Sequence, residues 1–153
     1  LAFQRRVGRL QGAAMAAAKV LDTLQERCRY VAKTVKDQPR LDEELRRRAR
    51  KIELRLADLE IGLSGDRLIA GHKEPAPPSL LSRIRRAASG DWNLPPTGTQ
   101  QRAYEIAAEA FGKWLPRLQA AAAELEELDK ALDQAGAPWT PGRLPKWTGV
   151  GPR

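Results

Sequence analysis

Few residues of this chain carry side chains that could bind a metal ion or attack a substrate. Its 153 residues include one cysteine, Cys28, and one histidine, His72. A disulfide framework is therefore excluded, and a cysteine–histidine metal site, which takes about four ligands, is nearly excluded. His72 lies in a segment bounded by Gly and Pro, which predicts an exposed loop histidine. Cys28 falls on an apolar helical stripe, so we predict a buried, unreactive thiol rather than a nucleophile.

Carboxylates are the other candidates for acid–base chemistry, and they occur in two groups. Glu105 and Glu109 are four residues apart, and Glu124, Glu126 and Glu127 follow in the same expected helix. Both groups lie near Lys and Arg, which favours ion pairing or solvation on a helix surface. The chain contains no Gly-rich phosphate loop and no Ser–His–Asp set. The sequence thus predicts no catalytic residue, no cofactor and no metal site, and we expect a protein that is not an enzyme.

Basic side chains are distributed unevenly along the chain. Residues 1–90 contain 20 Lys and Arg against 11 Asp and Glu, whereas residues 91–153 contain 7 against 8. Clustered basic residues bind phosphates, so nucleic acid or an anionic surface is an alternative partner, bound through the basic face of residues 46–55 and 83–86. For the run at 46–51 we favour the solvated side of a helix, because an acidic turn precedes it. The candidate anion-binding residues are Arg46, Arg47, Arg50, Lys51, Arg83, Arg85 and Arg86.

Four tryptophans stand out in a chain with few aromatic residues. Trp114 falls in an expected helix, whereas Trp92, Trp139 and Trp147 fall in expected loops or in the tail. These three are candidates for docking a partner. The alternative is structural: an indole pins a loop across a bundle end, with its N–H satisfied at the rim. We favour pinning for Trp92 and Trp139 and leave both interpretations open for Trp147.

The elements that must position these residues are helices. Ala and Leu number 24 and 20, whereas Val and Ile number 5 each, and that ratio favours helix over strand. Residues 3–35 place apolar side chains at alternating steps of four and three, the period of a coiled-coil seam. These positions are Phe3, Val7, Leu10, Ala14, Ala17, Leu21, Leu24, Cys28, Val31 and Val35. The same spacing recurs at Leu45, Ala49, Ile52, Leu56, Leu59 and Leu63.

Turn signals separate these helices and predict two more. We expect Pro39 in the first turn of the second helix, and a connection this short makes the first two helices antiparallel. Residues 64–78 are expected to form a loop, and residues 79–89 a short helix that ends at Gly90. The last helix is expected from about Thr97 or Thr99 to residue 135, with a kink at Pro116. Its expected seam is Tyr104, Ala108, Phe111, Leu115, Leu118, Ala122, Leu125, Leu128, Leu132 and Ala135.

These lengths predict an elongated all-α protein. At 1.5 Å per residue, the three long helices match one another if the short helix completes the second. We therefore expect an antiparallel three-stranded helical bundle over residues 1–138, followed by an irregular Pro- and Gly-rich tail over residues 139–153. No apolar run approaches the roughly 20 residues of a membrane span. The chain starts without Met, and the apolar helical spacing is already present at Phe3. We therefore expect a piece of a longer protein.

Four short motifs, taken in order, resemble a known family. They are PSLLSRI at 78–84, LPPT at 94–97, QRAYE at 101–105 and LDQAGAP at 132–138. Their order resembles the C-terminal helical region of bacterial sortilin-like β-propeller proteins, which carry Asp-box repeats and are often labelled glycosyl hydrolases. The helical hairpin of residues 3–63 is similar to the one preceding this region in that family. The Asp-box Ser-x-Asp-x-Gly-x-x-Trp is absent here, so the resemblance transfers no catalytic residue.

The sequence therefore favours one function and leaves an alternative. The favoured function is that of a non-catalytic helical accessory module, which packs on a parent β-propeller or mediates self-association. The parent β-propeller is implied by the resemblance, whereas self-association is suggested by the long apolar seams. The alternative is electrostatic binding of nucleic acid or an anionic surface by the basic residues named above.

Overall fold

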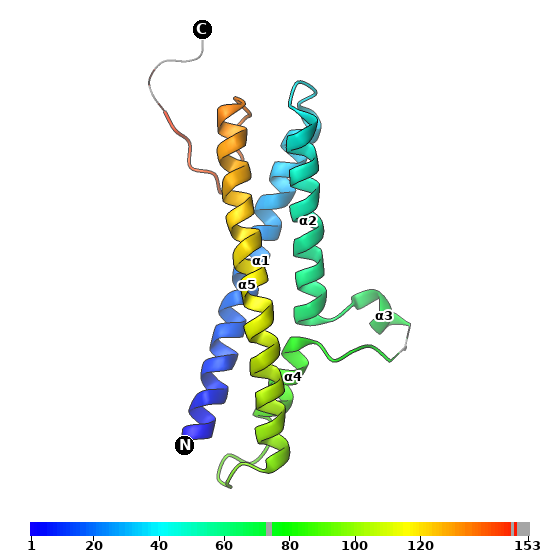
Figure 1. The fold of residues 1–153 in the computed structure, drawn as a ribbon, viewed down its shortest axis with the longest axis vertical. Coiled ribbons are helices and arrows are strands. Elements are labelled where there is room, and N and C mark those ends of the chain that lie inside the picture. Colours follow the sequence, from blue (N-terminus) through cyan, green and yellow to red (C-terminus); the bar gives the residue numbers. More distant parts are fainter. Residues whose placement is uncertain (73–74, 148, 150–153) are drawn as a thin grey trace.

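The structure, a computed structural model, describes residues 1–72, 75–147 and 149. Within these residues it is an all-α helical bundle without strands, as predicted (Figure 1). Its helices are α1 (Ala2–Asp37), α2 (Glu43–Ser64), α3 (Arg67–Gly71), α4 (Leu80–Ala88) and α5 (Gly98–Gln134). α1 and α5 run along the length of the molecule, and α2 and α4 follow one another along the third edge. None of the described helices is long and apolar enough to cross a membrane.

The apolar stripe of α1 faces the bundle as the sequence predicts. The positions from Val7 to Val35 are all buried, and only Phe3, at the start of the stripe, is half-buried. Phe3 instead makes an edge contact with Tyr104, with ring centroids 5.8 Å apart, and the Arg6 guanidinium lies over the same ring. The stripe of α2 is likewise buried at every predicted position. Packing of these stripes supplies most of the stability of such a bundle.

The turn between α1 and α2 differs from the prediction in one detail. Pro39 is not in the first helical turn, because the helix starts later, at Glu43. Asp42 is the N-cap, and its carboxylate accepts a hydrogen bond from the backbone N–H of Glu44. The carboxylates of Glu43 and Glu44 then lie at the positive end of the helix dipole. The local capping signal at Asp42 therefore determines the boundary, and Pro39 belongs to the turn.

The expected loop at 64–78 contains a helical turn that the sequence analysis missed. α3 follows two residues after α2, and the Asp66 side chain caps it by accepting from the N–H of Leu68. Five residues are too short for an apolar period to show, which explains the missed helix. Residues 73 and 74 of the expected loop lie outside the described residues. α4 begins after its predicted cap Ser79, whose hydroxyl accepts from the N–H of Ser82.

The last helix begins at the cap that the sequence favours. Thr97 is the N-cap of α5 and forms a capping box with Gln100, so Thr99 is not the cap. The helix continues through Pro116 to Gln134, so the proline does not break it. Its buried face is rotated from the predicted seam by one residue at three places. Ala107, Trp114 and Ala121 are buried, whereas Ala108, Leu115 and Ala122 are only partly buried at the edge of the core.

The start of the expected tail is packed onto the bundle. Thr140 and Arg143 are buried, although the sequence predicts only an irregular tail here and gives no sign that it packs on the bundle. The Arg143 side chain is only 3% exposed and pairs with the carboxylate of Asp133. This segment has no helix or strand, and the ion pair of Arg143 holds it on the bundle. No local sequence pattern predicts such a pair. The predictions for residues 148 and 150–153 lie outside the described part of the chain.

Candidate functional site

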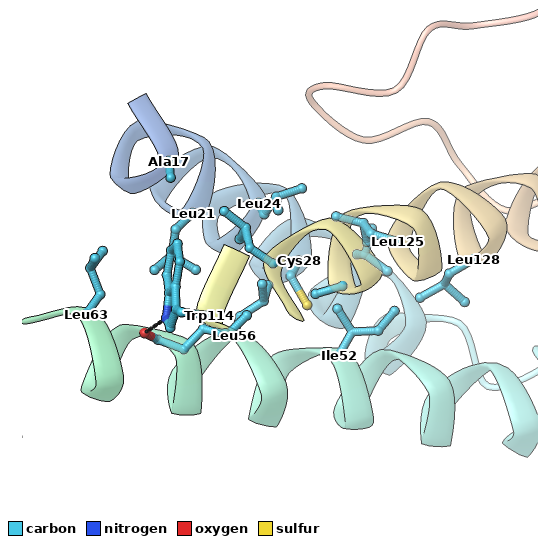
Figure 2. Packing of buried hydrophobic residues seen from close by; sticks show 14 of the residues in the cluster. Ala17, Leu21, Leu24, Cys28, Ile52, Leu56, Leu63, Trp114, Leu125 and Leu128 are labelled. Carbon is cyan, nitrogen blue, oxygen red and sulfur yellow. Dashed lines mark hydrogen bonds between the residues drawn. The ribbon is translucent and has the colours of Figure 1, made fainter. Parts of the chain in front are cut away.

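The single thiol lies in the middle of the core. Cys28 is 1% exposed, and its Sγ donates to the carbonyl oxygen of Ala49 at 3.9 Å (Figure 2). Burial, followed by the negative charges of Glu53 and Asp129, raises the pKa of the Cys28 thiol to about 11. A raised pKa keeps the thiol protonated at neutral pH, which disfavours its reaction as a nucleophile. The predicted burial of Cys28 is confirmed, and its lack of reactivity stays a prediction.

We expect Cys28 to report on opening of the bundle. A thiol reagent such as Ellman's reagent should modify it at pH 8 at least a hundredfold more slowly in the folded chain than in 6 M guanidinium, because reaction requires unfolding around it. The thiol binds its proton more tightly in the folded state than in the unfolded state. This tighter proton binding adds to the free energy of unfolding. The added stability is complete below about pH 8.5 and is lost as the pH rises toward 11. Equal rates in folded and unfolded chains would contradict this burial.

The carboxylates considered for acid–base work are engaged in ion pairs. Glu109 pairs with Lys113 at 2.8 Å, and the lysine lowers the pKa of that glutamate. Glu105 pairs with Arg102, and Glu124 pairs with Arg55 on α2. The others pair in the same way, Glu126 with Arg27 and Glu127 with Lys130. Within the described residues, no group of three or more Cys, His, Asp or Glu could hold a metal ion.

The basic run of α2 has structural partners. Arg46, Arg47 and Arg50 pair along the helix with Glu43, Glu44 and Glu53, at 3.2, 3.0 and 2.8 Å. Arg46 also donates to the carbonyl oxygens of Val35 and Gln38, and so closes the carboxyl end of α1. Lys51 is exposed. Most of the charge in this run is thus compensated by neighbouring carboxylates.

The other predicted basic residues lie on α4, far from that run. α2 begins at one end of the bundle and α4 lies toward the other (Figure 1). The structure therefore does not bring the two sets together into one basic face. Arg85 is exposed, while Arg83 and Arg86 line a groove between α4 and the first turns of α5.

This groove, which we call the arginine-rimmed groove, has a volume of about 460 Å³. Its basic side chains are Arg83 and Arg86 from α4 and Arg102 from α5. Apolar surface is supplied by Pro78, Ala103 and Ile106. The lining is completed by small residues, Ser82 on α4 and Gly98 and Thr99 at the start of α5. The groove thus combines an apolar floor with three positive charges and has no carboxylate in its lining.

The three arginines of this groove differ in their ion pairs. Within the described residues, Arg83 and Arg86 form no ion pair, and Arg102 pairs only with Glu105, outside the lining. The last-turn position of Arg86 has a structural use, because positive charge stabilises the carboxyl end of a helix. That use does not extend to Arg83, one turn earlier. Like charges at a spacing of three residues repel one another, so Arg83 and Arg86 without an ion pair do not stabilise the helix through their proximity.

A larger groove between α1 and α2 is a weaker candidate. Its volume is about 670 Å³, and its lining mixes Asp22, Glu26, Glu53, Arg29 and Arg67. Gln25 donates to Glu60 across it at 2.7 Å. Its lining holds four carboxylates against two arginines, so this groove does not share the positive character of the arginine-rimmed groove.

The three tryptophans outside the described helices are exposed. Trp92 and Trp139 are 43% and 49% exposed, so each keeps about half of its surface in solvent, and the pinning of loops by these side chains stays a prediction. Trp147 is 76% exposed. Trp92 precedes α5 and the other two follow it, so a helix of about 55 Å separates them and they form no common docking site. The tryptophan that joins elements is Trp114, whose Nε1 donates to the carbonyl oxygen of Leu59 at 3.0 Å (Figure 2).

Only two of the nine residues that line the groove were predicted from the sequence. The charge pattern indicated Arg83 and Arg86 but gave no reason to select Arg102, Ala103 or Ile106. The missed residues share one face of α5, and the available signal was Ile106, an apolar residue off the predicted seam. Only the packing of α4 on α5 shows that both faces border one hollow.

Fold and surface together define the class of this protein: an all-α helical bundle that carries an arginine-rimmed groove. No family model, no curated protein and no solved structure matches the chain. The resemblance to sortilin-like propeller proteins therefore has no support from these comparisons and stays a prediction.

Proposed function

We propose that this chain is a non-catalytic helical module that binds a segment of another protein in the arginine-rimmed groove. The observation that carries the proposal is the combination of apolar surface with three arginines in one hollow, two of which, Arg83 and Arg86, form no ion pair within the described residues. The groove therefore offers a partner both apolar surface and positive charge in one hollow.

Size and shape support a peptide segment as the ligand. A volume of about 460 Å³ holds a few side chains, and the groove lies between two packed helices. Such grooves accept a third helix, whose apolar face lies in the hollow while its polar face stays in water. The partner in the favoured form of the proposal belongs to the parent protein, as the resemblance implies, or to a second copy of this chain.

The experiment is selection of peptides from a random display library on the immobilised chain. We expect enriched peptides that compete with one another and lose binding to the variant Ala103→Trp, which fills the groove. The matched control is Ala120→Trp, on an exposed part of the same helix, which should bind as the parent chain does. Thermal unfolding of both variants establishes that they fold. Failure to enrich peptides, or equal binding by the two variants, would exclude the groove as a docking site.

Self-association is tested separately by sedimentation over a range of concentrations. A rise in mass that Ala103→Trp abolishes and Ala120→Trp preserves supports a second copy as the partner. A strictly monomeric chain removes that form of the proposal and leaves a different protein as the partner.

A further inference from the structure

We infer that the occupant of the arginine-rimmed groove is an acidic amphipathic helix, one that presents a bulky apolar side chain flanked by carboxylates. This inference deepens the proposed function and rests on it. It specifies the chemistry of the partner, whereas the proposed function requires only that a peptide binds.

Charge specifies the flanking groups. Arg83 and Arg86 are one turn apart on α4, and Arg102 borders the groove from α5, so positive charge lies on both sides of the hollow. A guanidinium presents paired donors that match a carboxylate, and the match gains strength where apolar surface excludes water. A basic or neutral segment would leave Arg83 and Arg86 without ion-pair partners when it covers them, which carries a desolvation cost.

The floor specifies the central group. Ile106 is 36% exposed, and Ala103 lies one turn before it, so both leave apolar surface in the hollow. An apolar side chain placed between Ala103, Ile106 and Pro78 would remove this surface from water. The hollow has room for such a group because Ala103, Gly98 and Ser82 are small.

The same features argue against nucleic acid. Recognition of single strands relies on aromatic side chains that stack on bases, and the lining contains none. Duplex binding relies on a basic track along the phosphates, whereas the basic run of α2 lies at the other end of the bundle and is paired with carboxylates. A short groove with an apolar floor therefore fits a protein segment better.

The test is titration with four designed peptides, acetylated and amidated helices of about 14 residues. The first presents two Leu flanked by Glu on one face; in the others, Gln replaces Glu, Lys replaces Glu, or Ala replaces Leu. Methyl NMR signals of Ile106 locate binding, and calorimetry at about 50 mM salt measures it. We expect the Leu/Glu peptide to bind with a dissociation constant on the order of 100 µM and to shift the Ile106 signal. The other three should bind at least tenfold more weakly.

Variants of the chain supply the matched control. The double variant Arg83→Gln/Arg86→Gln should bind the Leu/Glu peptide at least tenfold more weakly. Arg85→Gln lies on the same helix but does not line the groove, so its affinity should change less than twofold. Because these side chains are on the surface or half-buried, thermal unfolding should be nearly unchanged in both variants.

Several outcomes would overturn the inference. Equal binding of the Gln peptide, equal losses in Arg85→Gln and the double variant, or tighter binding of a 20-base-pair DNA that shifts Ile106 would each do so. If the display selection enriches neutral or basic peptides that still depend on Ala103, the proposed function survives and this inference fails. If no peptide depends on Ala103, both fail.

Discussion

Replacing Trp114 with alanine should lower the free energy of unfolding by about 3–5 kcal/mol. The indole is 5% exposed and lies between helices, stacked on Phe111 with ring centroids 6.1 Å apart. It also rests against Gly62 of α2, where an added Cβ would stand 3.5 Å from the indole Cδ1. Its N–H donates to the Leu59 carbonyl oxygen. The substitution therefore removes a large apolar group, leaves a cavity and breaks the polar contact between α5 and α2 (Figure 2).

Denaturant unfolding followed by circular dichroism measures this effect. The matched control is Trp139→Ala, which removes the same side chain from a position 49% exposed and should cost less than about 1 kcal/mol. If Trp114→Ala does not fold, Trp114→Phe keeps most of the apolar group, and we expect a loss of about 1–3 kcal/mol from the missing hydrogen bond and the smaller ring. Equal midpoints for Trp114→Ala and Trp139→Ala would contradict the position of Trp114 in the core.

Replacing Arg143 with alanine should cost about 3 kcal/mol and release the segment after α5. The guanidinium pairs with Asp133, lies 3.8 Å from an oxygen of Asp129 and donates to the Pro138 carbonyl oxygen at 3.0 Å. Asp129 is itself buried and keeps one further partner nearby, Arg27 at 2.6 Å. Removing Arg143 leaves buried carboxylate oxygens with fewer positive partners, and that is the main energetic loss.

The loss should depend on pH. Burial raises the pKa of Asp129, although Arg27 and Arg143 oppose the shift. A carboxyl group with a raised pKa in the folded state stabilises the fold below its unfolded pKa of about 3.9, and this contribution is lost as the pH rises through the folded pKa. Without Arg143 the pKa of Asp129 should rise further. The deficit of Arg143→Ala should therefore be largest near pH 7 and should shrink toward pH 4.

Denaturant unfolding at both pH values tests this prediction, and limited proteolysis tests the release of the segment after α5. Lys146→Ala is the control, because this residue is exposed and should change neither stability nor cleavage. A deficit that stays constant between pH 4 and pH 7 would show that the buried carboxylates are not its source. Unchanged cleavage in Arg143→Ala would show that the arginine does not hold the segment.

The predicted seams succeeded where apolar and polar residues contrast and failed where they do not. α1 and α2 place Leu, Val and Ile among charged residues, so their buried faces can be identified from spacing alone. α5 contains the run Ala120–Ala123, in which neighbouring positions are equally apolar. Spacing cannot decide there whether Ala121 or Ala122 is buried. Trp114 was missed for a related reason: Leu115 beside it fitted the assumed period as well.

The sequence by itself determined the four longer helices and most of the core, but not α3 or the start of α2. These properties depend on contacts within about four residues and on a period that repeats along one helix. Only the tertiary structure decided which charges meet, because Arg27 and Asp129, or Arg143 and Asp129, are joined by folding and not by spacing. The same holds for the arginine-rimmed groove, whose two sides lie on different helices. The sequence of a helix indicates which of its faces is buried. It does not indicate which neighbouring helix covers that face, or where two neighbouring helices leave a groove between them.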